Sequence, residues 1–449
     1  MLQSPQSVNF FSLENEIIND LKNSSKNCIN TIENNKKLIL GNQTFAKDFV
    51  QKLNNALLSG LNDYPLIDKV LNHDYFTEVL SEFRESNILV RACDNNNKSL
   101  VKWLLTKDIN LSIQDEYGRT ALMYAAQHYS LLFAVESMIK SNGKFIHLAD
   151  INGNTALFYG VTNINIIEKM LKAPFDFSHI NNDNENILLY NCKKDAYKSF
   201  SKILKLNLDP NLVNNVGKTA AMYLVEHGRY FQLKELISKY HININFKNKF
   251  GETLVSVLIK KYHSDYNNFD ENFYTESNYL KFKNYACTLV ELVKLGCDFN
   301  IVIDEDGNTP ILYFLLAEEY VCANYILHNC YIDITYKNNH GICACSLVPY
   351  LNEGLFDSLE YRKRRNRKKL SMKSLKQKLT TYYSSEENEK DYIIMSQNKY
   401  SPSARTPLVQ QWFMEILYPT VGAVFVHRTQ LTNINGSYVV PAKLKKQNN

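Results

Sequence analysis

The sequence lacks a hydrophobic run long enough to cross a membrane. Its longest apolar stretch, from Trp412 to Val426, is interrupted by Glu415 and Pro419 and is shorter than the roughly 20 residues that a membrane helix needs. Hydrophobic residues nevertheless make up 45% of the 449 positions, which is enough for a large core and too much chain for one ordinary domain. We therefore expect a soluble protein that does not contact membranes.

Catalytic motifs are also missing. The sequence contains no glycine-rich phosphate loop, no Gly-x-Ser-x-Gly turn and no His-Glu-x-x-His helix. The one cluster of histidines and cysteines, made of His328, Cys330, His340, Cys343 and Cys345, does not have the spacing of zinc ligands. The sequence thus predicts no catalytic residue, no metal, no cofactor and no small-molecule substrate, and hence a protein that is not an enzyme.

Paired cysteines and a secretory leader are absent as well. The nine cysteines are odd in number and mostly isolated, and residues 1–11 are polar without an apolar core. Both features are typical of proteins that keep their thiols reduced. The expected location is therefore the cytoplasm, the nucleus or both.

What the sequence does contain is an internal repeat. The segment Asp115-Glu-Tyr-Gly118-Arg-Thr120-Ala-Leu122 returns, with a glycine at its fourth position, from Asp150, Asn214, Asn248, Asp304 and Asn338. A degenerate copy begins at Asn182 and has Glu185 at the glycine position. The fourth positions (118, 153, 185, 217, 251, 307 and 341) are separated by 35, 32, 32, 34, 56 and 34 residues. All but one interval lie close to a period of about 33 residues.

This pattern resembles the ankyrin-repeat family, whose unit reads Asp-x-x-Gly-x-Thr-Pro-Leu-His-x-Ala-Ala and ends in Gly-Ala-Asp-x-Asn. Endings of that kind are Leu295-Gly-Cys-Asp-Phe-Asn300 and Leu206-Asn-Leu-Asp-Pro-Asn211. The resemblance implies an all-α solenoid over residues 82–360, with seven to eight units that each combine a β-hairpin loop with a helix-turn-helix. The most N-terminal unit keeps its helices but lacks the hairpin pattern.

Two positions of the unit carry specific expectations. Threonine at the start of the first helix is expected to cap free N–H groups, at Thr120, Thr155, Thr219, Thr253 and Thr309. Tyrosine follows four residues later, at Tyr124, Tyr159, Tyr223 and Tyr313. An aromatic binding stripe is one interpretation of these tyrosines, but the family packs this position between repeats. We therefore expect core tyrosines.

Residues 1–81 are expected to form an N-terminal helical segment of three or four helices. Phe45, Phe49 and Leu53 share one face of such a helix. A cap on the first repeat is favoured over an independent partner-binding domain. The interval of 56 residues adds about 22 residues at 262–285, rich in aromatic and acidic side chains, which we expect to be a surface loop. A functional loop and a tolerated expansion both remain open for it.

The positive charge is concentrated after the repeats, in a basic segment and linker at 361–406. Ten basic residues and no acidic one lie between Arg362 and Lys378. A nuclear import signal, a nucleic-acid contact and a plain solvated helix are the alternatives for the run Arg362, Lys363, Arg364, Arg365, Arg367, Lys368 and Lys369. Residues 407–449 are expected to form a small α+β or partly disordered segment, with strands joined at Asn435-Gly436.

The family resemblance implies that a protein partner binds at the hairpin tips and the concave face. The corresponding positions hold Glu116, Tyr117, Arg119, Gln127, His128, Lys218, His227, Phe250, Lys260 and Lys261. We therefore expect a non-enzymatic interaction module or adaptor. The alternative is a nuclear regulatory protein that contacts nucleic acid or chromatin partners through the basic segment 362–378.

Overall fold

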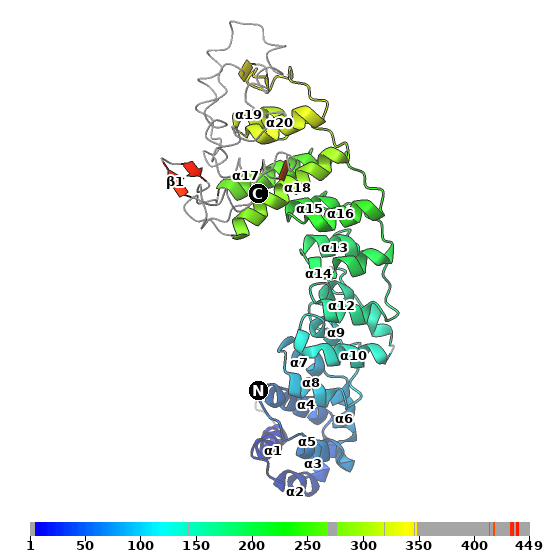
Figure 1. Cartoon of the computed structure of the whole chain (residues 1–449). Helices are drawn as coiled ribbons and strands as arrows, with labels where there is room; N and C mark the ends of the chain where they lie inside the picture. The colour runs from blue at the N-terminus through cyan, green and yellow to red at the C-terminus, as the bar shows by residue number, and fades with distance from the viewer. Residues whose placement is uncertain are drawn as a thin grey trace, which may run out of the picture. The chain divides into compact units, whose positions relative to one another are not determined.

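The computed structural model describes residues 5–141, 143–267, 276–317, 319–344 and 346–347, with 413, 416–417, 432–434 and 437–439. The chain divides into two compact units, Met1–Leu208 and Asp209–Asn449, and each is considered by itself. Apart from one short β-hairpin, the described elements are helices (Figure 1). The predicted all-α architecture built from repeated helix pairs is therefore confirmed.

The first unit opens with helices that are not part of hairpin-bearing repeats. They are α1 (Pro5–Lys22), α2 (Asn27–Asn34), α3 (Lys36–Gly41), α4 (Phe45–Leu58), α5 (Tyr64–Leu71) and α6 (Thr77–Arg84). The prediction of three or four helices was too low, because asparagine-containing breaks such as Asn35 (φ −110°, ψ 22°) divide the segment into shorter pieces. The predicted face of α4 is buried, since Phe45, Phe49 and Leu53 are at most 1% exposed.

These N-terminal helices pack against the helix pair that follows. Helices α7 (Ile88–Asp94) and α8 (Lys98–Leu104) form that pair. Trp103 of α8 stacks on Tyr64 with ring centres 4.9 Å apart, and its Nε1 donates a hydrogen bond to Oδ1 of Asp68 at 3.1 Å. The α5 helix is thereby held on α8 by both an aromatic and a polar contact.

The remaining repeats of the first unit follow as helix pairs. They are α9 (Ala121–Ala125) with α10 (Leu132–Lys140), α11 (Ala156–Gly160) with α12 (Ile164–Met170), and α13 (Ile187–Lys193) with α14 (Tyr197–Ile203). Helix α11 contacts α9 before it, α13 after it and its own partner α12. Leu122 and Leu157 are at most 1% exposed between these helices. The core therefore grows by contacts between neighbouring repeats, as expected for a repeat protein.

The described part of the second unit contains three further pairs. They are α15 (Ala220–Glu226) with α16 (Tyr230–Lys239), α17 (Leu254–Asn267) with α18 (Glu276–Lys294), and α19 (Pro310–Leu316) with α20 (Tyr320–Asn329). Near the C-terminus, β1 (Thr432–Ile434) pairs antiparallel with β2 (Ser437–Val439), and Ile434 lies opposite Ser437. Two residues separate the strands, so the hairpin predicted from Asn435-Gly436 is confirmed.

The extra residues of the long repeat begin and end in helices and not in a surface loop. Helices α17 and α18 have 14 and 19 residues, whereas α15 and α16 have 7 and 10. Tyr262 and Phe282 are each 2% exposed and Tyr285 is 6% exposed. The prediction was wrong because Leu254, Leu258 and Tyr262 continue one apolar helical face past the usual helix end. Residues 268–275 lie outside the described part.

Candidate functional site

Each hairpin-bearing repeat begins with an aspartate or asparagine whose side chain organises the loop. Oδ1 of Asp115 accepts hydrogen bonds from the backbone N–H groups of Tyr117 (2.9 Å) and Arg119 (2.8 Å). Because one side chain satisfies two backbone donors, the loop is held as a tight turn that presents its second and third residues. The same pair of bonds is made by Asp150, Asn181, Asn248 and Asn338.

The fourth residue of the loop has a left-handed backbone. Gly118 and Gly153 have φ angles of +70° and +75°, a region that side chains with a Cβ atom rarely adopt. Space is a second restriction at Gly153, because a Cβ atom would lie 2.6 Å from Oδ1 and 2.8 Å from the backbone N of Asn182 in the next repeat. Glycine is therefore required there both for its backbone and for the close approach of two loops.

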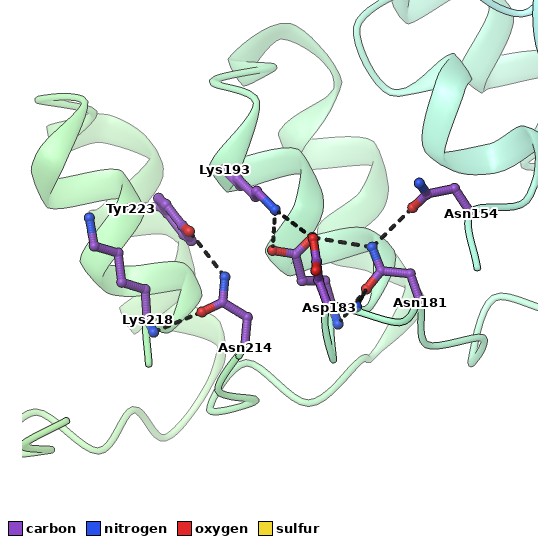
Figure 2. Close-up of polar contacts among 8 residues, drawn as sticks. Asn154, Asn181, Asp183, Lys193, Asn214, Lys218 and Tyr223 are labelled. Carbon is purple, nitrogen blue, oxygen red and sulfur yellow. Dashed lines mark hydrogen bonds and ion pairs between the residues drawn. The ribbon is translucent and has the colours of Figure 1, made fainter. Parts of the chain in front are cut away.

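The register of the degenerate repeat was predicted wrongly by one residue. The left-handed position is Asn184, with φ +60°, rather than Glu185. Asparagine tolerates this conformation better than other non-glycine residues. Glu185 is instead fully buried, and its carboxylate accepts hydrogen bonds from Nζ of Lys193 (2.8 Å) and Nδ2 of Asn181 (3.2 Å); both donor residues are labelled in Figure 2. An internal ion pair therefore occupies the position that the sequence pattern assigned to glycine.

Threonine caps the first helix in some of the repeats. The backbone N–H of Met123 donates to Oγ1 of Thr120 at 3.4 Å, and Thr219 and Thr253 accept equivalent bonds at 3.3 Å. The prediction is wrong at Thr155 and Thr309, whose side chains make no capping hydrogen bond. Helix α19 begins instead with a proline, whose ring presets the first helical φ.

A tyrosine in the first helix of two repeats donates a hydrogen bond to the aspartate that begins the loop. The hydroxyl of Tyr124 donates a hydrogen bond to Oδ2 of Asp115 at 2.7 Å, and the hydroxyl of Tyr159 donates to Oδ2 of Asp150. Burial, helped by the bond to Asp115, raises the pKa of Tyr124 to about 12, so it remains a donor at neutral pH. Core tyrosines are confirmed at Tyr124, Tyr223 and Tyr313, each at most 8% exposed, whereas Tyr159 is half-buried.

Arg119 was predicted to contact a partner, and the structure holds it in an aromatic setting. The centre of its guanidinium lies 5.8 Å from the ring of Tyr117, 5.5 Å from that of Tyr124 and 5.3 Å from that of Tyr159 in the next repeat. A cation at such distances is attracted to the ring faces. The half-buried Arg119 is therefore a fixed part of the loop surface rather than a mobile surface arginine.

Asparagine side chains connect successive loops. In the first unit, Nδ2 of Asn182 donates to the carbonyl of Ile151 at 3.0 Å. Nδ2 of Asn181 donates to Oδ1 of Asn154, also at 3.0 Å, as Figure 2 shows. In the second unit, Nδ2 of Asn338 donates to Oδ1 of Asn308 at 2.9 Å. Asparagine side chains thus connect neighbouring loops within each unit.

The loop tips carry exposed apolar side chains. In the first unit, Tyr117 is 50% exposed and Ile151 is 63% exposed, and the backbone N–H of Ile151 donates to the carbonyl of Tyr117 at 3.1 Å. In the second unit, Val216 and Phe250 are 51% and 65% exposed. Tyr117 and Phe250 were predicted contact residues, whereas Ile151 was not among the predicted ones. The signal available in the sequence was that Ile151 is apolar, although the second position of such a loop otherwise favours polar residues.

The other predicted contacts of the first unit lie at the surface of the same repeat. Glu116 is exposed beside Tyr117 at the hairpin tip. Gln127 is exposed and His128 is partly exposed just beyond the end of α9. The predicted residues of this repeat thus lie at two places on its surface, the hairpin loop and the region just beyond the end of α9.

The predicted lysines of the second unit form ion pairs within their own repeats. Nζ of Lys218 lies 2.6 Å from Oε2 of Glu226 (Lys218 appears in Figure 2), and Nζ of Lys260 lies 3.0 Å from Oε1 of Glu252. Although burial acts in the opposite direction, the bonds from Lys260 and Asn248 lower the pKa of Glu252. Surface pairs of this kind add little stability. In each pair, however, the charge of the lysine is balanced by a carboxylate of the same repeat.

A pocket of about 260 Å³ opens among three helices of the second unit. It contains two further predicted contact residues, His227 and Lys261, next to the buried rings of Tyr262 and Phe282. The full lining is Val225, Glu226, His227, Gly228, Leu258, Lys261, Tyr262, Lys281, Phe282, Asn284 and Tyr285. The extended parts of α17 and α18 therefore supply most of this pocket.

A residue from the C-terminal segment packs against the same rings. The rings of Tyr262 and Tyr285 stack with centres 4.0 Å apart, and Phe282 lies at 6.0 Å from Tyr262. Phe413 is fully buried, with its ring centre 5.6 Å from those of both tyrosines. We call Tyr262, Phe282 and Tyr285 the insertion cluster.

A buried carboxyl group lies beside the insertion cluster. Glu319 is 0% exposed, and burial raises its pKa well above the usual value, against the opposing effects of the Tyr262 hydroxyl and the Cys322 thiol. Burial and the nearby Glu319 also raise the pKa of Cys322. Burial thus favours the neutral form of both groups, which suits a structural role more than a nucleophilic one.

Other predictions concern metals, membranes and the basic run. Among the described residues, no group of three or more His, Cys, Asp or Glu side chains could hold a metal ion, and no described helix is long and apolar enough to span a bilayer. The predicted import or nucleic-acid residues Arg362, Lys363, Arg364, Arg365, Arg367, Lys368 and Lys369 lie outside the described part of the chain.

Comparison with known proteins bears on this geometry. The family model described as ankyrin repeats in three copies matches residues 58–149 and 89–181, a stretch that includes α5 to α12. An ankyrin repeat protein of fowlpox virus (strain NVSL), FPV034, is 23% identical over 205 residues, which are 45% of this chain. The matched region spans only 40% of that protein's length.

Similar solved structures also contain ankyrin repeats. The ankyrin repeat domain ABAYE2397 of Acinetobacter baumannii AYE is 19% identical, and the match covers 47% of this chain and 99% of that one with a TM-score of 0.37. The ankyrin repeat domain of Bcl-3 is 16% identical, covering 50% and 92% with a TM-score of 0.37. The family model matches a stretch that shows the hairpin-and-helix geometry, so residues 58–181 of this chain contain ankyrin repeats.

Proposed function

We propose that this chain is a non-enzymatic adaptor that binds a protein partner through its hairpin tips and the adjoining ends of its inner helices. Ankyrin repeats are in general protein–protein interaction modules, and repeat arrays offer extended surfaces for binding. The observation that carries the proposal is the pair Tyr117 and Ile151, two large apolar side chains that are at least half exposed on adjacent loops.

The rigidity of these loops supports the proposal. Asp115 anchors one tip through two backbone hydrogen bonds, and the bond from Ile151 to Tyr117 joins it to the next. A side chain presented on an ordered backbone loses less conformational entropy on binding than one on a mobile loop. Exposed aromatic residues are also enriched among those that dominate binding energy. Arg119 beside Tyr117 adds a fixed positive charge to the same surface.

The test compares tip variants with a surface variant elsewhere in the first unit. Proteins bound by the full chain in cells are captured and quantified by mass spectrometry for wild type, Tyr117→Asp with Ile151→Asp, and Tyr129→Asp. Tyr129 is 64% exposed and lies outside the hairpins, so it controls for the loss of an exposed apolar side chain. We expect the tip variant to lose its main partner at least tenfold, which corresponds to about 1.4 kcal/mol. Equal capture by both variants would contradict the proposal.

The alternative function, a nuclear regulator that contacts nucleic acid or chromatin partners through residues 362–378, remains a prediction from the sequence. Those residues lie outside the described part, so nothing in it favours this alternative. A cytoplasmic or nuclear location belongs to the main proposal, and the free thiols of the described cysteines are compatible with it.

A further inference from the structure

A charged residue directly after the left-handed loop position forms the same ion pair in three repeats. It pairs with a side chain of opposite charge that lies eight positions later, in the first helix of the same repeat. The pairs are Glu185 with Lys193 (2.8 Å), Lys218 with Glu226 (2.6 Å) and Glu252 with Lys260 (3.0 Å). In these repeats the charge of the loop residue is therefore balanced within the repeat itself.

Arg119 occupies this loop position but lacks such a pair. It follows Gly118, whose φ is +70°, and the residue eight positions later is Gln127. The uncharged amide of Gln127 donates from Nε2 to the backbone carbonyl of Met123 at 3.5 Å. Within the described part of the chain, no carboxylate forms an ion pair with the guanidinium of Arg119. This repeat therefore keeps the cation without the counter-charge that balances the other loop residues.

Lys218 shows what this position accepts when its cation is balanced. Nζ of Lys218 lies 5.3 Å from the ring centre of Tyr223, and the guanidinium centre of Arg119 lies 5.5 Å from that of Tyr124, the equivalent tyrosine. Beside Lys218, Oε2 of Glu226 completes the arrangement. Because Arg119 is only half-buried, a carboxylate from another molecule can take the corresponding place.

The nearby aspartates do not take that place. Oδ2 of Asp115 accepts a hydrogen bond from the hydroxyl of Tyr124, and Oδ2 of Asp150 accepts one from the hydroxyl of Tyr159. Their Oδ1 atoms accept from backbone N–H groups of their own loops. The two negative charges weaken the attraction of Arg119 for an anion at longer range. They do not compete for the direct, charge-assisted hydrogen bonds of the guanidinium.

The surroundings of Arg119 are ordered and partly apolar. Its guanidinium centre lies 5.8 Å from the ring centre of Tyr117 and 5.3 Å from that of Tyr159, so it loses little conformational freedom when it binds an anion. Tyr117 is 50% exposed, and Ile151 on the next loop is 63% exposed. A carboxylate bound to Arg119 therefore lies beside an apolar surface that its own chain can cover.

We propose that Arg119 binds a carboxylate side chain of the protein partner, at the place that Glu226 occupies beside Lys218. An apolar residue next to that carboxylate covers Tyr117 and Ile151. A guanidinium suits this role because two of its N–H groups can donate to one carboxylate in parallel. The inference deepens the proposed adaptor function and rests on it, since it names the chemistry of the partner segment that the hairpin tips of the first unit recognise.

The probe is a phage-displayed library of random dodecapeptides, selected on the full-length chain with Arg119→Gln as the counter-selection target. Each selected peptide is synthesised with its acidic residue and with the matching amide. Fluorescence anisotropy gives the affinity of both forms for wild type and Arg119→Gln, and the four values yield the coupling between guanidinium and carboxylate. Thermal unfolding verifies that each variant is folded.

Two further variants separate binding from stability. Gln127→Glu places a carboxylate eight positions after Arg119, as Glu226 is placed after Lys218. It should compete with the peptide, and because residue 127 is exposed it leaves the packing of Arg119 intact. Lys140→Gln removes a positive charge at an exposed position of α10, the second helix of the same repeat, and is the matched control for charge.

We expect the selected peptides to carry aspartate or glutamate next to an aromatic or aliphatic residue. The affinity of the carboxylate form should fall at least tenfold for Arg119→Gln and at least threefold for Gln127→Glu, but less than twofold for Lys140→Gln. The amide form should lose less than twofold on Arg119→Gln.

Three results would overturn the inference: no peptide that prefers wild type over Arg119→Gln, a selection without acidic enrichment, or equal losses for the carboxylate and amide forms. The capture experiment decides the adaptor proposal separately, because its changes at Tyr117 and Ile151 leave Arg119 in place. A chain that passes the capture experiment and fails the peptide experiment binds its partner through the tips without a carboxylate.

Discussion

Glu319 shows how a single residue couples the stability of this fold to pH. Its carboxyl group is fully buried, and burial raises its pKa well above the usual value. The folded chain therefore keeps a proton that the unfolded chain releases at about pH 4.3. Above that pH the folded state binds more protons than the unfolded state, so stability falls as the pH rises towards the folded pKa.

Replacing the carboxyl group with an amide removes this titration. We expect Glu319→Gln to be more stable than wild type at pH 7, by a margin that grows between pH 5 and pH 7 by at most about 1.4 kcal/mol per pH unit. Thermal unfolding across this range measures the margin. Glu116→Gln at an exposed hairpin tip is the control. A margin for Glu319→Gln that does not change with pH would show that the carboxyl group is not held neutral.

The hairpins show for which single residues the structural role could be predicted from the sequence. Asp115 and Gly118 were recognised because a turn anchored by a side chain and a left-handed backbone each favour few residue types. The third hairpin was misread, because asparagine replaces glycine at position 184 and is followed by the buried Glu185, which pairs with the half-buried Lys193. Arg119 was predicted to lie on a hairpin loop, but its three aromatic neighbours come from two repeats and only the folded chain brings them together.

At the scale of elements, the insertion is a structural extension of two helices. Its buried rings pack on one another and on Phe413. Truncation of a buried phenylalanine typically costs about 3–5 kcal/mol. Leu280 lies on the same helix and is 45% exposed, so its truncation should cost far less.

We therefore expect Phe282→Ala to destabilise the second unit by about 3–5 kcal/mol, and Leu280→Ala by less than about 1 kcal/mol. Urea unfolding followed by fluorescence and circular dichroism provides the measurement. Replacing all of 262–285 with a short Gly/Ser linker should be at least as damaging as Phe282→Ala. Should the linker variant unfold at the same urea concentration as wild type, the insertion would be dispensable to the core after all.

Helix identity was easier to predict than helix extent. The face of α4 with Phe45 and Phe49 was recognised from its spacing and is buried. The helical nature of Tyr262 to Tyr285 was missed, because the departure from the repeat length suggested an insertion in a loop. The apolar spacing from Leu254 to Tyr262 carried the correct signal. The length of the repeat, compared with the family pattern, was therefore a weaker guide to secondary structure than the local 3.6-residue spacing of apolar residues.

At the scale of the whole molecule, each repeat mainly contacts its neighbours. A destabilising substitution should therefore affect the nearby repeats more than the distant ones. The helices that α11 mainly packs on belong to its own repeat and the adjacent repeats. Helix α1, by contrast, packs on α2 and α4. Gly153→Val should introduce strain of about 1–3 kcal/mol, apart from the clash with Asn182. Leu157→Ala, at a buried position, should cost roughly 2–5 kcal/mol.

Amide hydrogen exchange should locate the effect of these two changes. We expect faster exchange in α9 to α13 and little change in α1 and α2 of the same unit. Ile151→Ser at an exposed tip in the same repeat is the control, because it removes neither a buried contact nor a left-handed glycine. A uniform rise in exchange across the first unit would mean that the unit unfolds as one cooperative body.

The sequence by itself determined the repeat period, the residues that turn each loop and the helical class of the fold, because these features depend on interactions within about 33 residues of chain. Tertiary structure decided which side chains of that pattern are available to a partner. Lys218 and Lys260 looked free in the sequence but pair with carboxylates of their own repeats. The pocket beside the insertion cluster also exists only in the folded chain, because its walls come from three helices between residues 225 and 285 that pack side by side.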